Sequence, residues 1–119
     1  MDPLMLCIHM NKERALRLSF AAMAQGVRVK IVPEDQEGQP LSALCGLEAP
    51  AARPSALRAG EEMLVFAFLP DDLLERLLPA LRRDMPPVRL KAVLTPHNRR
   101  WTCGALCRHL SLEAAQMGR

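Results

Sequence analysis

The feature that most constrains the fold of this chain is an internal repeat. Residues 27–33 read Val-Arg-Val-Lys-Ile-Val-Pro, and residues 88–96 read Val-Arg-Leu-Lys-Ala-Val-Leu-Thr-Pro. Each segment follows an amphipathic stretch, which itself follows an apolar run. Self-similarity of this kind indicates two copies of one supersecondary unit. The sequence therefore predicts a single domain, residues 1–119, with strand–helix–strand (βαβ) units in residues 1–33 and 61–119 and a connector, residues 34–60, between them.

The first unit is predicted to begin with an apolar strand over residues 4–9. A helix then follows to about Gln25, because Asn11 is a good N-cap residue and Gly26 is a typical helix terminator. Its apolar face is predicted from helical spacing, and the second strand from strict alternation with Arg28 and Lys30. The predicted apolar positions are Leu16, Phe20, Met23 and Ala24 in the helix, and Val27, Val29 and Ile31 in the strand.

The second unit repeats this order, with a predicted strand over residues 63–69. Asp71 or Asp72 is expected to cap the following helix, in which Pro79 predicts a kink or an early end near Leu78. Thr102 is expected to cap a last helix. The apolar positions are Leu73, Leu74, Leu77, Leu78 and Leu81 in the first helix, Val88, Leu90 and Ala92 in the strand, and Leu106, Leu110, Ala114 and Met117 in the last helix.

Burial indicates where each strand lies in the sheet. The first strand of each unit is apolar on both faces, whereas the second has a charged face, so the first strands are expected at the centre and the second strands at the edges. This placement favours an α+β fold with a ferredoxin-like sheet of order 4-1-3-2 and the last helix across its open face. A doubly wound α/β parallel sheet of order 2-1-3-4 fits the same burial, because the long connector can also make a crossover. Within the connector, residues 39–46 predict one short helix, since Pro40 stands at its start and Gly46 past its end.

Composition excludes several classes of protein. A formal charge of +3, with 50% hydrophobic and 24% charged residues, is typical of a globular domain and provides no large basic field for nucleic acid. The longest apolar run, residues 63–69, is far shorter than the roughly 20 residues that cross a bilayer. The acidic start is unlike an export signal, so the four cysteines are predicted to be reduced thiols of a cytoplasmic protein. No spacing of ligands predicts a metal or another cofactor.

Polar residues at two strand ends are the candidate binding residues. Glu34 and Asp35 follow the second predicted strand, and Thr95, His97 and Asn98 follow the fourth. A histidine beside an amide and a hydroxyl is suited to acid–base chemistry or anion binding. The alternative is turn chemistry, in which Asn98 bonds to neighbouring backbone. In a parallel sheet both groups lie at the same end of the strands, whereas in the ferredoxin-like sheet they lie at opposite ends.

Trp101 is a further candidate, together with the basic residues Arg99 and Arg100. Phe66 and Phe68 lie two apart on a predicted central strand, as do the base-stacking residues of RNA-binding sheets. The chain has only four aromatic residues of this kind, so packing of the two phenylalanines beneath the last helix is favoured instead. Trp101 is predicted to be a buried anchor that seats the last helix on the sheet.

The run Leu-Lys-Ala-Val-Leu-Thr-Pro-His-Asn-Arg-Arg-Trp-Thr, residues 90–102, resembles a small bacterial family of domains of unknown function, the one numbered 3783. The resemblance covers about residues 61–110, and a weaker similarity extends to residues 33–46. His97 stands where the family usually has Thr, and Ala105 where an acid would complete the capping box of Thr102. The resemblance implies a bacterial cytoplasmic protein but no assigned activity.

These observations favour a non-enzymatic binding or regulatory module that presents its connector and strand-end loops to a protein partner or a small ligand. The alternative is a small-molecule-binding domain or an enzyme that uses residues 34–35 and 95–98. A third hypothesis is weak nucleic-acid binding through Arg99 and Arg100. No catalytic residue is predicted, no membrane contact is expected, and homodimer formation is left open.

Overall fold

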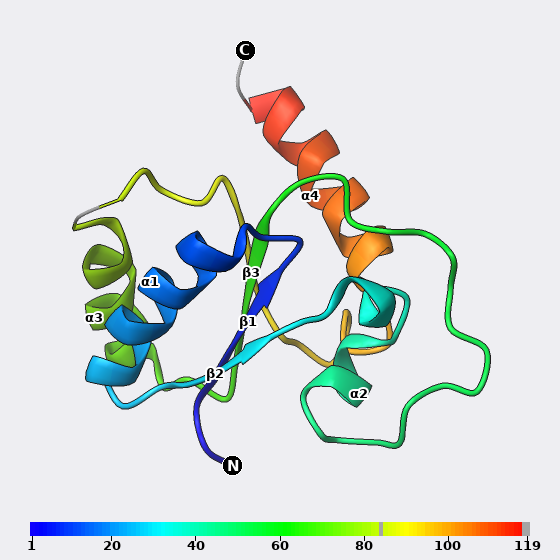
Figure 1. Cartoon of the computed structure of the whole chain (residues 1–119), viewed down its shortest axis with the longest axis horizontal. Helices are drawn as coiled ribbons and strands as arrows, with labels where there is room; N and C mark the ends of the chain where they lie inside the picture. The colour runs from blue at the N-terminus through cyan, green and yellow to red at the C-terminus, as the bar shows by residue number, and fades with distance from the viewer. Residues whose placement is uncertain (84, 118–119) are drawn as a thin grey trace.

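A computed structural model describes residues 1–83 and 85–117, in which four strands form one mixed sheet of order β2-β1-β3-β4. Figure 1 shows the arrangement of the helices around this sheet. The elements are β1 (Leu4–Ile8), α1 (Lys12–Ala24), β2 (Arg28–Ile31), the 3-10 turn η1 (Glu34–Gln36), α2 (Leu41–Leu44), β3 (Met63–Ala67), α3 (Asp71–Arg82), β4 (Leu90–Val93) and α4 (Cys103–Met117).

The strand directions differ from both predicted sheets. β1 pairs with β2 in parallel and β3 pairs with β4 in parallel, but the central pair β1–β3 is antiparallel. The ferredoxin-like order 4-1-3-2 is therefore wrong, because each unit keeps its own two strands adjacent. The doubly wound alternative has the observed order but the wrong direction for the central pair. The predicted central position of β1 and β3, with β2 and β4 at the edges, is confirmed.

The antiparallel centre decides on which face the helices lie. A βαβ crossover is almost always right-handed, so two units related by a half-turn place their helices on the same face of the sheet. Accordingly, α1 and α3 lie together on one face, and α2 and α4 lie on the other (Figure 1). An all-parallel sheet of the same order would have put α1 and α3 on opposite faces. As expected, the last helix, α4, covers the face of the sheet opposite α1 and α3. The helix α2 and the connector cover the same face.

Two hydrophobic clusters fill the spaces between these layers. Alternate residues of the central strands face each cluster, as the two-residue period of a strand requires. Phe66 belongs to the α1–α3 cluster and is 2% exposed, so it neither packs beneath α4, as predicted, nor offers a surface for stacking a base. The strand residues beneath α2 and α4 are Leu6, Ile8, Met63, Val65 and Ala67.

The buried face of α1 differs from the prediction. Leu16, Phe20 and Met23 are 43%, 70% and 60% exposed, and the helix instead buries Ala15, Leu18, Ser19 and Ala22. Both sets have helical spacing, so periodicity alone does not distinguish them. The set of mostly small side chains lies against the sheet because it lets α1 approach closely beside the leucine-rich α3. The buried Ser19 hydroxyl donates to the Ala15 carbonyl oxygen at 2.6 Å, so this polar group is satisfied.

The predicted helix ends are mostly confirmed. The Asn11 side chain accepts bonds from the backbone N–H groups of Glu13 and Arg14, and the Thr102 hydroxyl accepts from Ala105 N–H. Gly26, with φ of +82°, ends α1 in a conformation that suits glycine.

The helix α3 departs from its predicted ends. The N-cap position of α3 is Pro70 without a side-chain bond, so Asp71 and Asp72 lie in its first turn and do not cap it. The helix also continues through Pro79 to Arg82 and does not end near Leu78. In α4, the side chain of Met117, predicted to share the apolar face, lies outside the described residues.

The connector, residues 34–60, contains the predicted short helix as α2 and is tied back on itself by hydrogen bonds. The Gln39 side chain pairs with the backbone of Ala51 through bonds of 2.7 and 3.3 Å, and Ser55 N–H donates to the Gly38 carbonyl at 3.0 Å. The N–H groups of Leu41 and Ser42 donate to the carbonyls of Trp101 and Arg99, which joins the connector to the turn before α4. Among the described residues, no helix is both long and apolar enough to span a lipid bilayer.

Candidate functional site

Thr95 and Asn98 form a closed turn after β4. Thr95 N–H donates to the Asn98 amide oxygen at 2.9 Å, and Asn98 N–H donates to the Thr95 hydroxyl at 3.2 Å. The Asn98 amide nitrogen donates to the Val93 carbonyl at 3.0 Å. Both side chains are therefore engaged in holding the turn, while His97 between them is exposed.

Glu34 and Asp35 lie on η1 and are exposed, far from this turn in the topology. β2 and β4 are the two outer strands, and they run in opposite directions because the central pair is antiparallel. The ends that these two groups follow therefore lie at opposite edges and opposite ends of the sheet. The structure does not bring the two groups together into one site.

Trp101 stacks edge-on with two histidines at the start of α4. Its ring centroid lies 5.5 Å from that of His97 and 5.1 Å from that of His109, which in turn pairs with Glu113 at 3.0 Å. The indole is half-buried against the cluster beneath α4. Its backbone carbonyl accepts the N–H of Leu41, so the residue contacts α2, α4 and the sheet-side core at once.

We expect Trp101→Ala to lower the free energy of unfolding by about 2 kcal/mol, less than a fully buried aromatic residue costs. The loss comes from apolar area and from the two edge-on ring contacts. Urea unfolding followed by circular dichroism measures it. Leu112→Ala is the matched control, because Leu112 lies on the same helix but is 60% exposed. An equal cost in the two variants would contradict the anchoring role of Trp101.

The outer face of α1 carries apolar side chains that the core does not use. Leu16, Phe20 and Met23 form an exposed apolar stripe along this helix. Phe20 is one of only four Phe and Trp residues in the chain, and at 70% it is more exposed than Leu16 and Met23 on the same helix. Large exposed apolar side chains grouped on one element are typical of a surface that another molecule covers.

A groove runs beside this stripe, between α1 and the side chains of Ala80, Arg83, Met85 and Pro86. Two hollows of about 520 and 330 Å³ share Arg17 and Met85 and so form one groove along the length of α1, which is about 20 Å. Its floor near the C-terminal end of α1 consists of small side chains that leave room for bulky ones. The lining residues are Asn11, Glu13, Arg14, Arg17, Phe20, Ala21, Ala24, Gln25, Ala80, Arg83, Met85 and Pro86.

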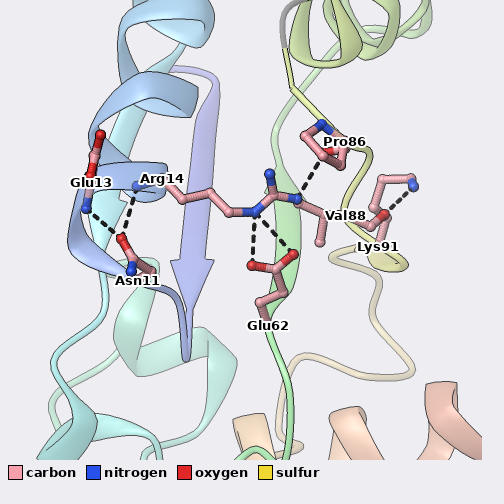
Figure 2. Close-up of polar contacts among 7 residues, drawn as sticks. All are labelled: Asn11, Glu13, Arg14, Glu62, Pro86, Val88 and Lys91. Atoms are coloured by element: carbon pink, nitrogen blue, oxygen red, sulfur yellow. Dashed lines mark hydrogen bonds and ion pairs between the residues drawn. The ribbon is translucent and has the colours of Figure 1, made fainter.

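Arg14 fixes the wall of the groove. Its Nε donates to both carboxylate oxygens of Glu62, at 3.0 and 2.9 Å, and its terminal nitrogen donates to the Pro86 carbonyl at 2.8 Å (Figure 2). These bonds join the first βαβ unit to the residue before β3 and to the segment after α3. The groove has two other arginines, Arg17 and Arg83, and both are exposed. Arg17 forms an exposed ion pair with Glu13, four residues earlier on the same helix. Because exposed pairs of this kind are weak, Arg17 can exchange its partner for another carboxylate.

The helical spacing of Leu16, Phe20 and Met23 predicts a buried face, whereas the structure exposes these side chains. The signal that distinguishes the two possibilities is the second stripe, Ala15, Leu18 and Ala22, on the same helix. The sheet can cover only one apolar stripe of a helix, so the second stripe of α1 is left exposed.

Burial disfavours the thiolate form of three of the cysteines. All four are free and buried, and burial raises the pKa of Cys7 and Cys103 to about 12 and that of Cys45 to about 11. Cys103 begins α4, where the helix dipole favours a thiolate, but desolvation has the larger effect there. In the part of the chain that the structure describes, no group of three or more His, Cys, Asp or Glu side chains is arranged to hold a metal ion.

Comparison with known proteins matches part of the chain to a family but gives no function. No curated protein and no solved structure matches the chain significantly. The model of a domain of unknown function, DUF3783, matches residues 62–117, which include β3, α3, β4 and α4. The match thus includes one wall of the groove and the complete second βαβ unit, whereas α1 lies outside it. The family that the run at residues 90–102 resembles is confirmed: residues 62–117 match the DUF3783 family of domains of unknown function.

Proposed function

We propose that this protein is a non-enzymatic docking module that binds a partner protein in the groove that α1 forms with Ala80, Arg83, Met85 and Pro86. The observation that carries the proposal is the exposed stripe of Leu16, Phe20 and Met23 beside a groove with an alanine floor. Grooves between two helices commonly accept an amphipathic helix, whose apolar side chains enter at spacings of three and four residues. The groove along α1 accommodates about four helical turns of such a partner.

The charges favour an acidic partner segment. Three arginines and one glutamate are the charged side chains among the described residues that line the groove, and Arg17 and Arg83 flank its alanine floor. A segment with bulky apolar anchors and flanking Asp or Glu residues would complement both the shape and the charge. A second copy of this chain is disfavoured as the occupant, because it would bring the same arginines against those of the first.

Binding of two synthetic helical peptides tests the proposal. Both carry Leu at helical spacing over about four turns, one with Glu and the other with Lys at the flanking positions. We expect fluorescence anisotropy to show binding of the Glu peptide in the micromolar range and at least about tenfold weaker binding of the Lys peptide, and the preference to decrease as salt is added. No binding of the Glu peptide, or equal binding of both, would contradict the proposal.

Matched variants locate the binding site. Phe20→Ser is expected to weaken binding of the Glu peptide at least about tenfold without loss of stability, since the ring is 70% exposed. Leu112→Ser removes a similarly exposed side chain from α4 and is expected to leave binding unchanged. If sedimentation instead shows a dimer of the wild-type chain that Phe20→Ser dissociates, the occupant is a second copy and the proposal of an acidic partner is wrong.

A further inference from the structure

A buried carboxylate orients a histidine at the end of β1. Glu37 is 1% exposed, and its Oε1 accepts the Ala59 N–H at 2.9 Å. The Nδ1 atom of His9 lies 3.3 and 3.2 Å from the two carboxylate oxygens of Glu37, while the imidazole itself is about one-third exposed. Neither residue is suggested by the spacing of motifs in the sequence, because they are 28 positions apart.

This contact selects one tautomer of the neutral imidazole. A carboxylate only accepts hydrogen bonds, so the proton of the neutral ring is on Nδ1 and the lone pair is on Nε2. His9 has a φ of +54°, and Phe68, at the equivalent place after β3, has a φ of +65°. The left-handed backbone is thus common to both units and belongs to the strand–helix turn. What distinguishes the first unit is the carboxylate of Glu37 behind the imidazole.

The imidazole borders a hollow of about 290 Å³, the size of a small ligand. The hollow lies where the parallel strands β1 and β2 end and is lined by His9, Met10, Asn11, Val32, Glu34 and Glu37. The carboxyl ends of parallel strands are the usual place for ligands in sheets covered by crossover helices. The lining of this hollow shares Asn11 with the groove on α1, but His9 and Glu34 lie outside that groove, so ligand binding here is separate from the proposed docking function.

We propose that this hollow binds a small ligand that carries a primary ammonium group. Its available side-chain groups are mostly acceptors: Nε2 of His9 and the exposed carboxylate of Glu34. The Asn11 amide oxygen already accepts two backbone bonds at the start of α1. An ammonium group provides three N–H donors and one positive charge, which complements one imidazole acceptor and one carboxylate. The ammonium donates one N–H to Nε2 of His9 and another to Glu34, and no covalent bond changes.

Nuclear magnetic resonance of the full-length chain at about pH 8 tests this assignment. Long-range imidazole ¹⁵N spectra are recorded while ethanolamine hydrochloride is added to about 50 mM, a range suited to millimolar affinity. Choline chloride is the control ligand, since it has the same charge but no N–H donor. We expect the His9 Nε2 resonance to shift in a saturable manner with ethanolamine and at least about fivefold less with choline at equal concentration.

Two isosteric variants complete the test. Glu34→Gln is expected to weaken the ethanolamine-dependent shift at least about fivefold, because it removes the charged acceptor. Asp35→Asn is the matched control: Asp35 is adjacent and equally exposed but does not line the hollow, so the shift is expected to be unchanged. A shift that grows linearly without saturation, an equal response to choline, or an equal loss in both variants would overturn the proposal.

Discussion

Raising the pH from about 8 to about 10 is expected to lower the free energy of unfolding by about 5 kcal/mol. Burial raises the pKa of Cys7 and Cys103 to about 12 and that of Cys45 to about 11, so the folded protein keeps all three protons over this range. In the unfolded chain the same thiols lose their protons near the ordinary value of about 8.5. The unfolded state therefore binds fewer protons, and stability decreases as the pH rises.

The sign is opposite for Lys91. Desolvation, reinforced by the charge of Arg82, lowers the pKa of Lys91 in the folded protein, so in its titration range the unfolded state binds more protons and stability increases with pH. One lysine opposes three thiols, so the net effect remains a loss. The stabilisation by the thiols is fully present below about pH 8.5 and disappears as the pH rises toward 11 or 12.

Urea unfolding at several pH values, with a reducing agent present, measures this loss. Each single Cys→Ala variant at positions 7, 45 and 103 is expected to remove about one third of the pH dependence of the free energy of unfolding. This holds even if the substitution also changes the stability at neutral pH. The slope, not the absolute stability, is the informative quantity, because Cys→Ala also removes packing. An unchanged slope in all three variants would show that the thiols do not cause the alkaline loss.

Gly38→Ala is expected to destabilise the protein by about 3 kcal/mol. A Cβ atom at this position would lie 1.9 Å from the carbonyl oxygen of Ser55 and 2.9 Å from its carbonyl carbon. Both are backbone atoms, so no side-chain rotation relieves the clash. The Gly38 carbonyl also accepts the Ser55 N–H, so displacement of the two segments breaks that bond and loosens the connector beside Glu37.

Gly60→Ala is the control for this effect. A Cβ atom on Gly60 has no other atom within 4 Å, so this variant is expected to change stability by less than about 0.5 kcal/mol. Thermal unfolding of the two variants, measured side by side, distinguishes close approach from the general loss of a glycine. Similar stability of the two variants would show that residues 38 and 55 can separate without cost.

Several local features could be predicted from sequence because nearby residues determine them. The Asn11 and Thr102 caps, the end of α1 at Gly26 and the short helix α2 depend on bonds within a few positions, and the structure confirms them. The central and edge strands were also predictable, since a strand with two apolar faces must be covered on both sides. The resemblance to DUF3783 is likewise a property of one contiguous run.

The structure differs from the predictions at places where two local arrangements fit the sequence equally well. The two apolar stripes of α1 fit helical spacing equally well, and only packing beside α3 selects Ala15, Leu18 and Ala22 for burial. Asp71 and Asp72 were both acceptable caps, but Pro70 occupies that position. The proximity of His9 and Glu37 could not be predicted, because it depends on the path of the connector.

The sequence by itself determined the elements of this protein: two βαβ units, their central and edge strands, and most helix ends, since each follows from neighbouring residues or from how apolar a segment is. The tertiary structure decided the direction of the central strand pair, because both directions bury the same apolar surface and differ only in long-range pairing. That direction places α1 and α3 on one face, which creates the groove, and separates residues 34–35 from residues 95–98. Contacts between residues far apart in the chain are what select one of these arrangements, and no local pattern encodes them.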